Sequence, residues 1–179
     1  MMVDRMREPL ILVDDNDQAV GSAEKLVVHQ KGLLHRAFSV FVLRSRQGSF
    51  EMLLQLRHAD KYHAGGLWTN SCCGHPRPGE ETQAAAERRL AEETGLMLSL
   101  TPVGVFQYRA TFDNALIEHE IDHVFVGHDQ GQTLSPHPQE IEVVEWRSID
   151  WVKQDLLNQP KKYTPWFAQA LSVLEKSLV

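Results

Sequence analysis

Short apolar runs with a period of two recur along the chain, and each is bounded by turn-forming residues. This pattern predicts β-strands, because alternate side chains of a strand share one face. The predicted strands cover residues 10–13, 20–29 with a bend at Gly21, 36–44, 51–57, 103–112, 117–126 and 141–147. Residues 45–49, between two of these strands, predict a hairpin loop.

Helical spacing of apolar residues appears after residue 80. Residues 81–94 predict a helix whose end is marked by Gly95, a residue that accepts the left-handed conformation of a helix cap. Its predicted apolar side consists of Ala84, Ala85, Ala86, Leu90 and Ala91. Residues 149–157 and 165–176 predict two further helices. We therefore expect an α/β (α+β) fold with a mixed β-sheet between helices, in a single domain over residues 1–179.

Residues 58–80 show little regular pattern. They hold four Gly, two Pro, three His and both cysteines of the chain. A loop of this length inside a compact domain is usually functional. We expect Cys72 to be a small buried side chain. Cys73 is the better candidate for acid–base chemistry, because Gly74 and His75 follow it and nearby charge or metal can move a thiol pKa.

Composition narrows the classes of partner. The chain has 179 residues, 42% of them hydrophobic, and a net charge of −6. Nucleic-acid binders are more often basic, so we expect no nucleic-acid partner. An anionic substrate would need a few placed cations or metal ions. No apolar run approaches the ~20 residues of a membrane helix, and the N-terminus has no signal-peptide pattern. Adjacent cysteines cannot build a disulfide framework, so we expect a cytoplasmic protein without membrane contact.

Two carboxylates and several imidazoles have the character of metal ligands. Glu118 and Glu120 are two apart on a predicted strand, so their side chains leave the same face. Carboxylates placed in this way repel each other unless a cation lies between them. Imidazole together with carboxylate suits divalent ions such as Zn²⁺ or Mn²⁺. The candidate ligands are His29, His35, His75, Glu118 and Glu120.

We interpret the other histidines as surface or satisfied core residues. This group contains His58, His63, His119, His123, His128 and His137. Strand alternation also turns His119 and His123 away from the face that carries the two glutamates.

A third pattern begins at Gly74, continues at Glu80 and ends with residues 88–96. It resembles the Nudix box, a loop–helix–loop that holds a divalent ion against a diphosphate. Nudix hydrolases have a metal-binding glutamate where this chain has Arg89. A cation there removes a ligand and adds a phosphate-binding group, so the box fits holding a diphosphate better than cutting it. The alternative is an ordinary charged helix face with pairs such as Arg89 and Glu93.

Four motifs together resemble the type I isopentenyl-diphosphate Δ-isomerases of the Nudix superfamily. They are residues 32–40, 68–76, 108–110 and 118–122, in the order of that family. The resemblance implies interconversion of isopentenyl and dimethylallyl diphosphate by protonation and deprotonation of an allylic unit. It implies catalytic roles for Cys73 and Glu120, with Tyr108 assisting Glu120.

The same resemblance implies two divalent ions and a small prenyl diphosphate as the substrate of a monomer. His29, His35, His75, Glu118 and Glu120 match the ligands of one ion, Mn²⁺ or Zn²⁺. Glu93 and a backbone carbonyl at Cys73 match the ligands of Mg²⁺, which bridges to the diphosphate. Lys25, Arg57, Lys61 and Arg89 match the cations that bind the phosphates. Trp166 matches an aromatic residue of the isoprenoid pocket, although it could instead anchor the last helix.

Two rival functions make different predictions. A Nudix hydrolase would release phosphate and keep its activity in a Cys73→Ala variant. A non-catalytic metal- or nucleotide-binding module would retain metal without turnover and tolerate Tyr108→Phe. Neither rival gives Cys73 and the Glu118–Glu120 pair a task, so we favour the isomerase.

Overall fold

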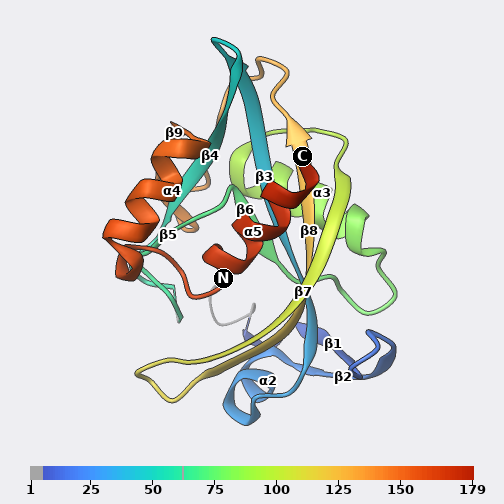
Figure 1. The fold of residues 1–179 in the computed structure, drawn as a ribbon. Coiled ribbons are helices and arrows are strands. Elements are labelled where there is room, and N and C mark those ends of the chain that lie inside the picture. Colours follow the sequence, from blue (N-terminus) through green and yellow to red (C-terminus); the bar gives the residue numbers. More distant parts are fainter. Residues whose placement is uncertain (1–5, 62) are drawn as a thin grey trace.

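The computed structural model describes residues 6–61 and 63–179. Within these residues one mixed sheet of nine strands runs through the molecule, as Figure 1 shows. The strands are β1 (Pro9–Val13), β2 (Ala19–Glu24), β3 (His35–Arg46), β4 (Ser49–Arg57), β5 (Trp68–Thr69), β6 (Cys72–Gly74), β7 (Thr101–Thr111), β8 (Ile117–His128) and β9 (Ile141–Ser148). The helices are α2 (Lys25–Lys31), α3 (Thr82–Thr94), α4 (Ile149–Asn158) and α5 (Phe167–Ser177), with a 3₁₀ turn η1 (Pro160–Lys162). The expected mixed sheet with helices is therefore confirmed.

Strand β3 is the centre of the sheet. It pairs in parallel with β8, and antiparallel with β1, β4 and β6. Its middle is an unbroken buried run from Ala37 to Leu43. Such a run is typical of a strand that is covered on both faces.

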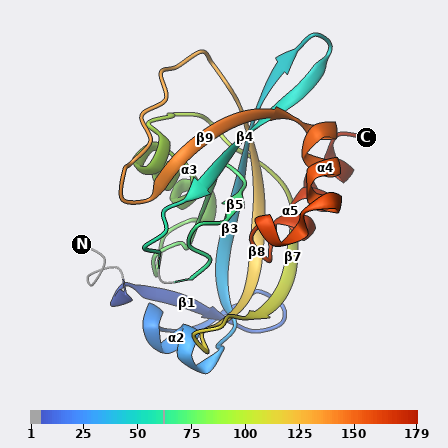
Figure 2. The ribbon, with the colours of Figure 1, turned by 90° about the vertical axis from the view of Figure 1, so that its left-hand side faces the viewer.

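Helices cover the two faces of the sheet, and strand alternation divides the core between them. Phe38, Val40 and Val42 pack in one hydrophobic cluster with α3. Phe41 and Leu43 point the other way, into a second cluster with α4 and α5. Figure 2 shows α3 on one side of the strands and α4 and α5 on the other. The site described below is therefore held by a sheet that is supported from both sides.

Helix α3 ends as predicted at Gly95, which adopts φ 80° and donates its N–H to the carbonyl of Ala91. Its buried side is narrower than predicted, because Ala84 is exposed and Ala91 only half-buried. Those two positions lie seven residues apart, and so on one row of the helix surface. That row faces away from the sheet, whereas Leu90 packs fully against it.

The prediction of a strand over residues 20–29 is wrong beyond Glu24. Residues 25–31 form α2, which ends at Gly32 with φ 66°. The β-branched residues Val27 and Val28 favoured a strand locally. The helix buries Val28 and His29 completely, so tertiary packing overrides that preference. One helical turn also places His29 above Lys25, and both residues belong to the site.

Two other connections are more ordered than the pattern predicts. The loop over residues 45–49 is a tight turn at Gln47 and Gly48, because β3 and β4 extend almost to each other; both turn residues have positive φ, 51° and 82°. Such a two-residue turn matches the twist of paired strands. Within residues 58–80 the short strands β5 and β6 add to the sheet through Gln55 and Ser39.

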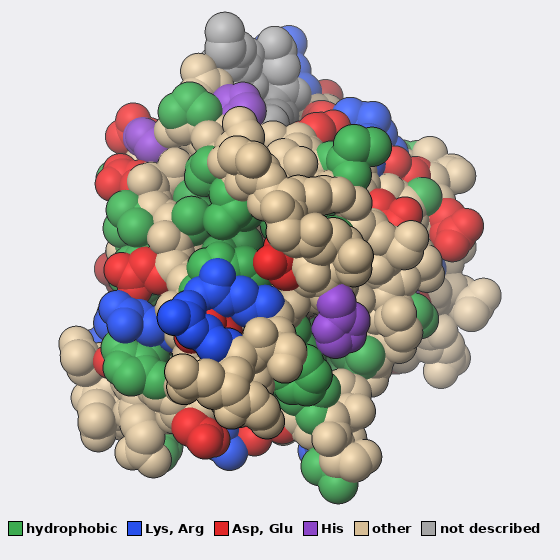
Figure 3. Space-filling view, turned by 90° about the horizontal axis from the view of Figure 1, so that it is seen from above, with side chains coloured by type: hydrophobic (Ala, Val, Ile, Leu, Met, Phe, Trp, Pro, Cys, Tyr) green, Lys and Arg blue, Asp and Glu red, His purple; other side chains and the backbone are tan. Residues whose placement is uncertain are grey.

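The end of the sheet that carries the β3–β4 turn faces the viewer in Figure 3. Acidic, basic and apolar side chains are interspersed on this face, and no single charge covers it. None of the helices in the described residues is long and apolar enough to cross a membrane.

Loss of the Leu90 side chain tests the packing of α3. We expect Leu90→Ala to lower the free energy of unfolding by about 2–5 kcal/mol, since the cavity left against the sheet refills only in part. Urea titration followed by circular dichroism measures this loss. Met97→Ala is the matched control, because Met97 is 76% exposed; we expect a change of about 0.5 kcal/mol or less. Equal losses in the two variants would contradict the placement of Leu90 in the core.

Candidate active site

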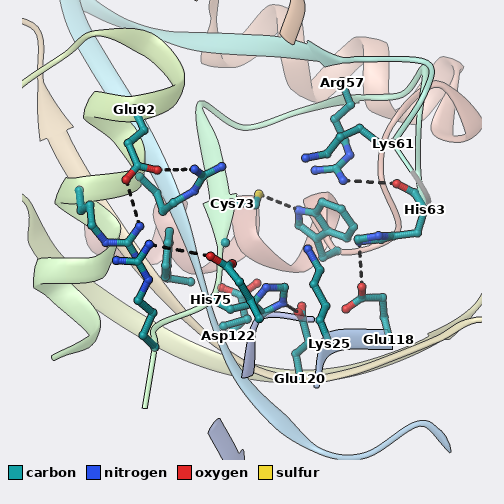
Figure 4. Close-up of a pocket in the computed structure, with 18 residues that line it drawn as sticks. Lys25, Arg57, Lys61, His63, Cys73, His75, Glu92, Glu118, Glu120 and Asp122 are labelled. Carbon is teal, nitrogen blue, oxygen red and sulfur yellow. Dashed lines mark hydrogen bonds and ion pairs between the residues drawn. The ribbon is translucent and has the colours of Figure 1, made fainter. Parts of the chain in front are cut away.

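A cavity of about 140 Å³ lies where α2, the start of β3, β6, β8 and the segment before α5 meet. We call it the pocket. Figure 4 shows its charged and titratable side chains converging from these separate elements. The predicted site residues that line it are Lys25, Arg57, Lys61, Cys73, His75, Arg89, Glu118, Glu120 and Trp166. The fold therefore brings most of the predicted residues together.

Strand β8 supplies the two carboxylates from one face, as strand alternation predicts. Glu118 and Glu120 are both buried and both line the pocket. Glu120 lies opposite His35 on β3 and opposite Tyr108 on β7 in the strand register. The Tyr108 hydroxyl donates to Glu118 Oε2 at 3.4 Å. The tyrosine thus lies beside both carboxylates.

Three of the predicted imidazoles surround these carboxylates. His29, His35, His75 and Glu118 each offer a ligand atom, and these four atoms lie within 4.8 Å of one another. Glu120 Oε2 lies 3.2 Å from Nε2 of His35 and 3.0 Å from Nε2 of His75. Four of the five ligands that the sequence predicts for the first ion thus form one group, and the fifth, Glu120, lies beside it.

Backbone carbonyls orient two of the rings. Nδ1 of His29 lies 2.8 Å from the carbonyl of Lys25, and Nδ1 of His35 lies 2.9 Å from the carbonyl of Leu33. A carbonyl can only accept, so each Nδ1 carries its proton and Nε2 is the nitrogen left to bind. This arrangement recurs in metal-ligating histidines.

The donor set fits a divalent cation. Nε2 atoms and carboxylate oxygens face one another at hydrogen-bond distance, an arrangement that needs a proton or a cation between them. Nitrogen and carboxylate ligands are those that Zn²⁺ and similar ions accept.

Cys73 lies on the wall of the pocket that β6 forms. Figure 4 shows it on the opposite side of the pocket from Glu118 and Glu120. Trp166 Nε1 donates to its sulfur at 3.2 Å. Burial, together with the nearby Asp122, raises the pKa of the Cys73 thiol to about 12. Cys73 is therefore held as a protonated thiol beside the cavity.

Cys72 points to the other face of β6, where it packs fully buried in the α3 core. This matches the expected structural role. Its sulfur lies 3.4 Å from Glu93 Oε2 and 3.9 Å from the carbonyl oxygen of Cys73. The predicted Mg²⁺ ligands, Glu93 and that carbonyl, thus lie around one sulfur atom.

Burial and the adjacent Glu118 raise the pKa of Glu120 to about 7. A cation among the imidazoles would oppose this shift, because it stabilises the ionised carboxylate.

Six cationic side chains line the pocket although the chain is acidic overall. They are the predicted Lys25, Arg57, Lys61 and Arg89, together with Arg77 and Arg88. Burial lowers the pKa of Lys25 to about 8. Arg89 donates to Glu93 at 2.9 Å, and Lys61 bonds to the buried Glu140. This concentration of positive charge suits an anion with several oxygens, such as a diphosphate.

Trp166 lines the pocket rather than serving only as an anchor of α5. Its ring lies 5.3 Å below the guanidinium carbon of Arg57 and is 4% exposed. The ring thus closes one side of the cavity.

His63, which was predicted to be a surface or satisfied core residue, is buried beside the carboxylates. His63 lines the pocket, and its Nε2 lies 2.8 Å from Glu118 Oε1. The irregular segment around it has no periodicity from which burial could be predicted. Sequence reasoning also missed Asp122, which lies two residues after Glu120 on the same strand face and so could have been found.

Comparisons with known proteins identify the family. A model of the NUDIX domain matches residues 33–167. An isopentenyl-diphosphate Delta-isomerase of Serratia proteamaculans is 51% identical over 162 residues, which cover 90% of this chain and 88% of the relative. The chain belongs to the isopentenyl-diphosphate Delta-isomerase family. The family member from Pectobacterium atrosepticum is 48% identical and covers 88% of this chain and 86% of its own length.

Solved structures agree on the NUDIX fold of this isomerase family member. A Deinococcus radiodurans protein superposes with a TM-score of 0.74 at 19% identity, covering 92% of this chain and 98% of its own. A MutT protein of Methanosarcina mazei gives a TM-score of 0.64 at 17% identity, covering 80% and 94%. The predicted resemblance and the mixed-sheet fold are both confirmed.

The opposite orientation of the two cysteines can be tested by alkylation. Single-cysteine variants, Cys72→Ala and Cys73→Ala, each leave one thiol for iodoacetamide. We expect Cys73 to be modified faster in the folded protein, because it borders the pocket while Cys72 is fully buried. Mass spectrometry of the intact variants gives both rates, and urea should make them equal. Faster modification of Cys72 in the folded state would contradict the observed geometry.

Proposed function

We propose that the protein is an isomerase that interconverts isopentenyl diphosphate and dimethylallyl diphosphate. The observation that carries this proposal is the pair formed by Cys73 and Glu120, which border one pocket from opposite sides with cations gathered beside them. The names of the relatives support the same substrate.

The reaction moves one proton onto the carbon skeleton and another off it. Protonation of isopentenyl diphosphate at its terminal carbon gives a tertiary cation at C3, and loss of a C2 proton then yields dimethylallyl diphosphate. Groups on both flanks avoid moving one acid–base group around the intermediate. We assign one of these proton transfers to Cys73 and the other to Glu120 with Tyr108; the group that acts as the acid starts protonated, and the opposite group starts ionised and accepts the C2 proton.

The tertiary carbocation must be kept away from water, because water would add to it and form an alcohol. Trp166 closes the pocket and presents its aromatic ring there. An aromatic face stabilises a desolvated cation by ~2 kcal/mol or more. The ring therefore has a chemical role in addition to its packing.

The diphosphate does not react and serves to anchor the substrate in the pocket. Lys25, Arg57, Lys61 and Arg89 bind it, so binding energy positions the carbon chain between the two reacting groups. Arg89 occupies the position of the hydrolytic glutamate, and it pairs with Glu93. This favours an isomerase over a Nudix hydrolase, and the placement of Cys73 in the pocket favours an enzyme over a binding module.

We propose two divalent ions. His29, His35, His75, Glu118 and Glu120 would hold Mn²⁺ or Zn²⁺, and Glu93 with the Cys73 carbonyl would hold Mg²⁺. Bound there, the ions offset repulsion between the carboxylates and neutralise diphosphate charge. A reducing compartment such as the cytoplasm suits the enzyme, because both cysteines are free thiols.

Isomerase activity can be measured directly. Pure protein with Mg²⁺ and isopentenyl diphosphate in D₂O should form deuterated dimethylallyl diphosphate while the diphosphate stays intact. We expect Cys73→Ala and Glu120→Gln each to lower kcat by about 10²–10⁴-fold or more, because each removes one acid–base group. Cys72→Ala, the matched control, should keep most of the activity. Full activity of Cys73→Ala, or release of phosphate by the unaltered protein, would refute the assignment.

The ion at the imidazole cluster can be tested separately from turnover. We expect His35→Ala to lose tightly bound transition metal after dialysis against a weak chelator, because His35 supplies an oriented nitrogen ligand. Metal analysis by mass spectrometry gives the content per chain. His128→Ala is the control, since His128 is exposed at the far end of β8. Unchanged metal content in His35→Ala would place the ion elsewhere.

A further inference from the structure

Asn70 lies beneath Cys73 and is completely buried. Its Nδ2 donates to the carbonyls of Val40 and Cys72, at 3.1 and 2.9 Å. Its Oδ1 accepts from the hydroxyl of Thr69 at 2.8 Å. Because the two carbonyls can only accept, they fix which end of the amide faces which way. The Oδ1 atom therefore has one defined direction.

That direction is toward the thiol of Cys73. The Cys73 sulfur donates to Asn70 Oδ1 at 3.3 Å and accepts from Trp166 Nε1 at 3.2 Å. The sulfur is thus held between an acceptor below and a donor from the segment before α5, and the Ser39 hydroxyl, which donates to Asp122, lies farther away at 3.9 Å. Figure 4 shows the sulfur directed to that donor at the edge of the pocket.

The two groups that hold the sulfur are also linked to each other. The hydroxyls of Thr69 and Thr164 lie 2.9 Å apart, and the Thr164 N–H donates to the carbonyl of Trp68 at 2.9 Å. Since Thr69 donates to Asn70, Thr164 must donate to Thr69. The chain segment that carries Trp166 is thereby fixed to the strand that precedes Asn70.

We propose that Asn70 is a positioning residue for Cys73, an inference that rests on the proposed isomerase function. A cysteine side chain has three staggered rotamers. Hydrogen bonds at the sulfur select one of them, which sets the distance from sulfur to the substrate carbon. Misplacement of a reacting group by about 1 Å can cost about 10²-fold in rate.

An amide suits this position because it donates and accepts at once. A hydroxyl is too short to reach two carbonyls and the sulfur together, and a carboxylate offers no N–H groups for the carbonyls. Within the described residues, Asn70 forms no hydrogen bond with the four cations that would bind the diphosphate. Its loss should therefore change turnover rather than substrate binding.

The test compares Asn70→Ala with Ser71→Ala. Ser71 is equally buried and bonds Leu53 and Val42 without touching the sulfur. We expect both variants to be less stable in urea. Only Asn70→Ala should lose kcat, by about 10²-fold, with KM close to that of the unaltered enzyme. An equal fall of kcat in both variants, or wild-type kcat in Asn70→Ala, would overturn the positioning role.

Infrared difference spectra of the unaltered protein test the hydrogen bond at the Cys73 sulfur even if the Asn70 variant does not fold. The spectrum of the unaltered protein minus that of Cys73→Ala isolates the S–H stretch of Cys73. We expect a band at the lower frequency of a hydrogen-bonded thiol, moving to the free-thiol position in folded Asn70→Ala. A free-thiol band in the unaltered protein would overturn the inference. Inactivity of the unaltered protein would instead reject the proposed function, since this spectrum needs no turnover.

Discussion

The parallel pairing of β3 with β8 is the interaction on which the site depends. It runs from His35 opposite Glu120 to Leu43 opposite His128. At one end it brings an imidazole against a carboxylate, and at the other it builds apolar core. A shift of one residue would turn every side chain of one strand to the opposite face. Core packing on both faces therefore fixes the geometry of the metal-type ligands.

Sequence reasoning was most successful where a pattern has a period. The alternation on β8 placed Glu118 and Glu120 on one face, and Gly95 marked the end of α3. It failed at α2, because local preference for a strand cannot report that Val28 and His29 are buried by a helix. It did not place His63 beside Glu118, since an irregular segment carries no periodic signal. Family motifs supplied the ligand set, whereas the distances between its members required the fold.

The site is assembled from distant parts of the chain. The ligand-type residues come from α2, the start of β3, the segment after β6 and the start of β8. No local segment could preform such a cluster, so an ion bound there stabilises the whole arrangement of elements against unfolding. The cations of the pocket also come from distant elements, so a bound anion would stabilise the same arrangement. Binding and folding are thus linked at this end of the sheet.

The adjacent thiols on β6 have a further consequence for oxidative damage. Strand alternation sends the Cys72 sulfur into the core and the Cys73 sulfur to the cavity. The two atoms cannot join to each other while β6 remains paired with β3. Oxidants that enter the pocket therefore meet one thiol without a resolving neighbour. Such a thiol proceeds to higher oxidation states or to a mixed disulfide with a small thiol.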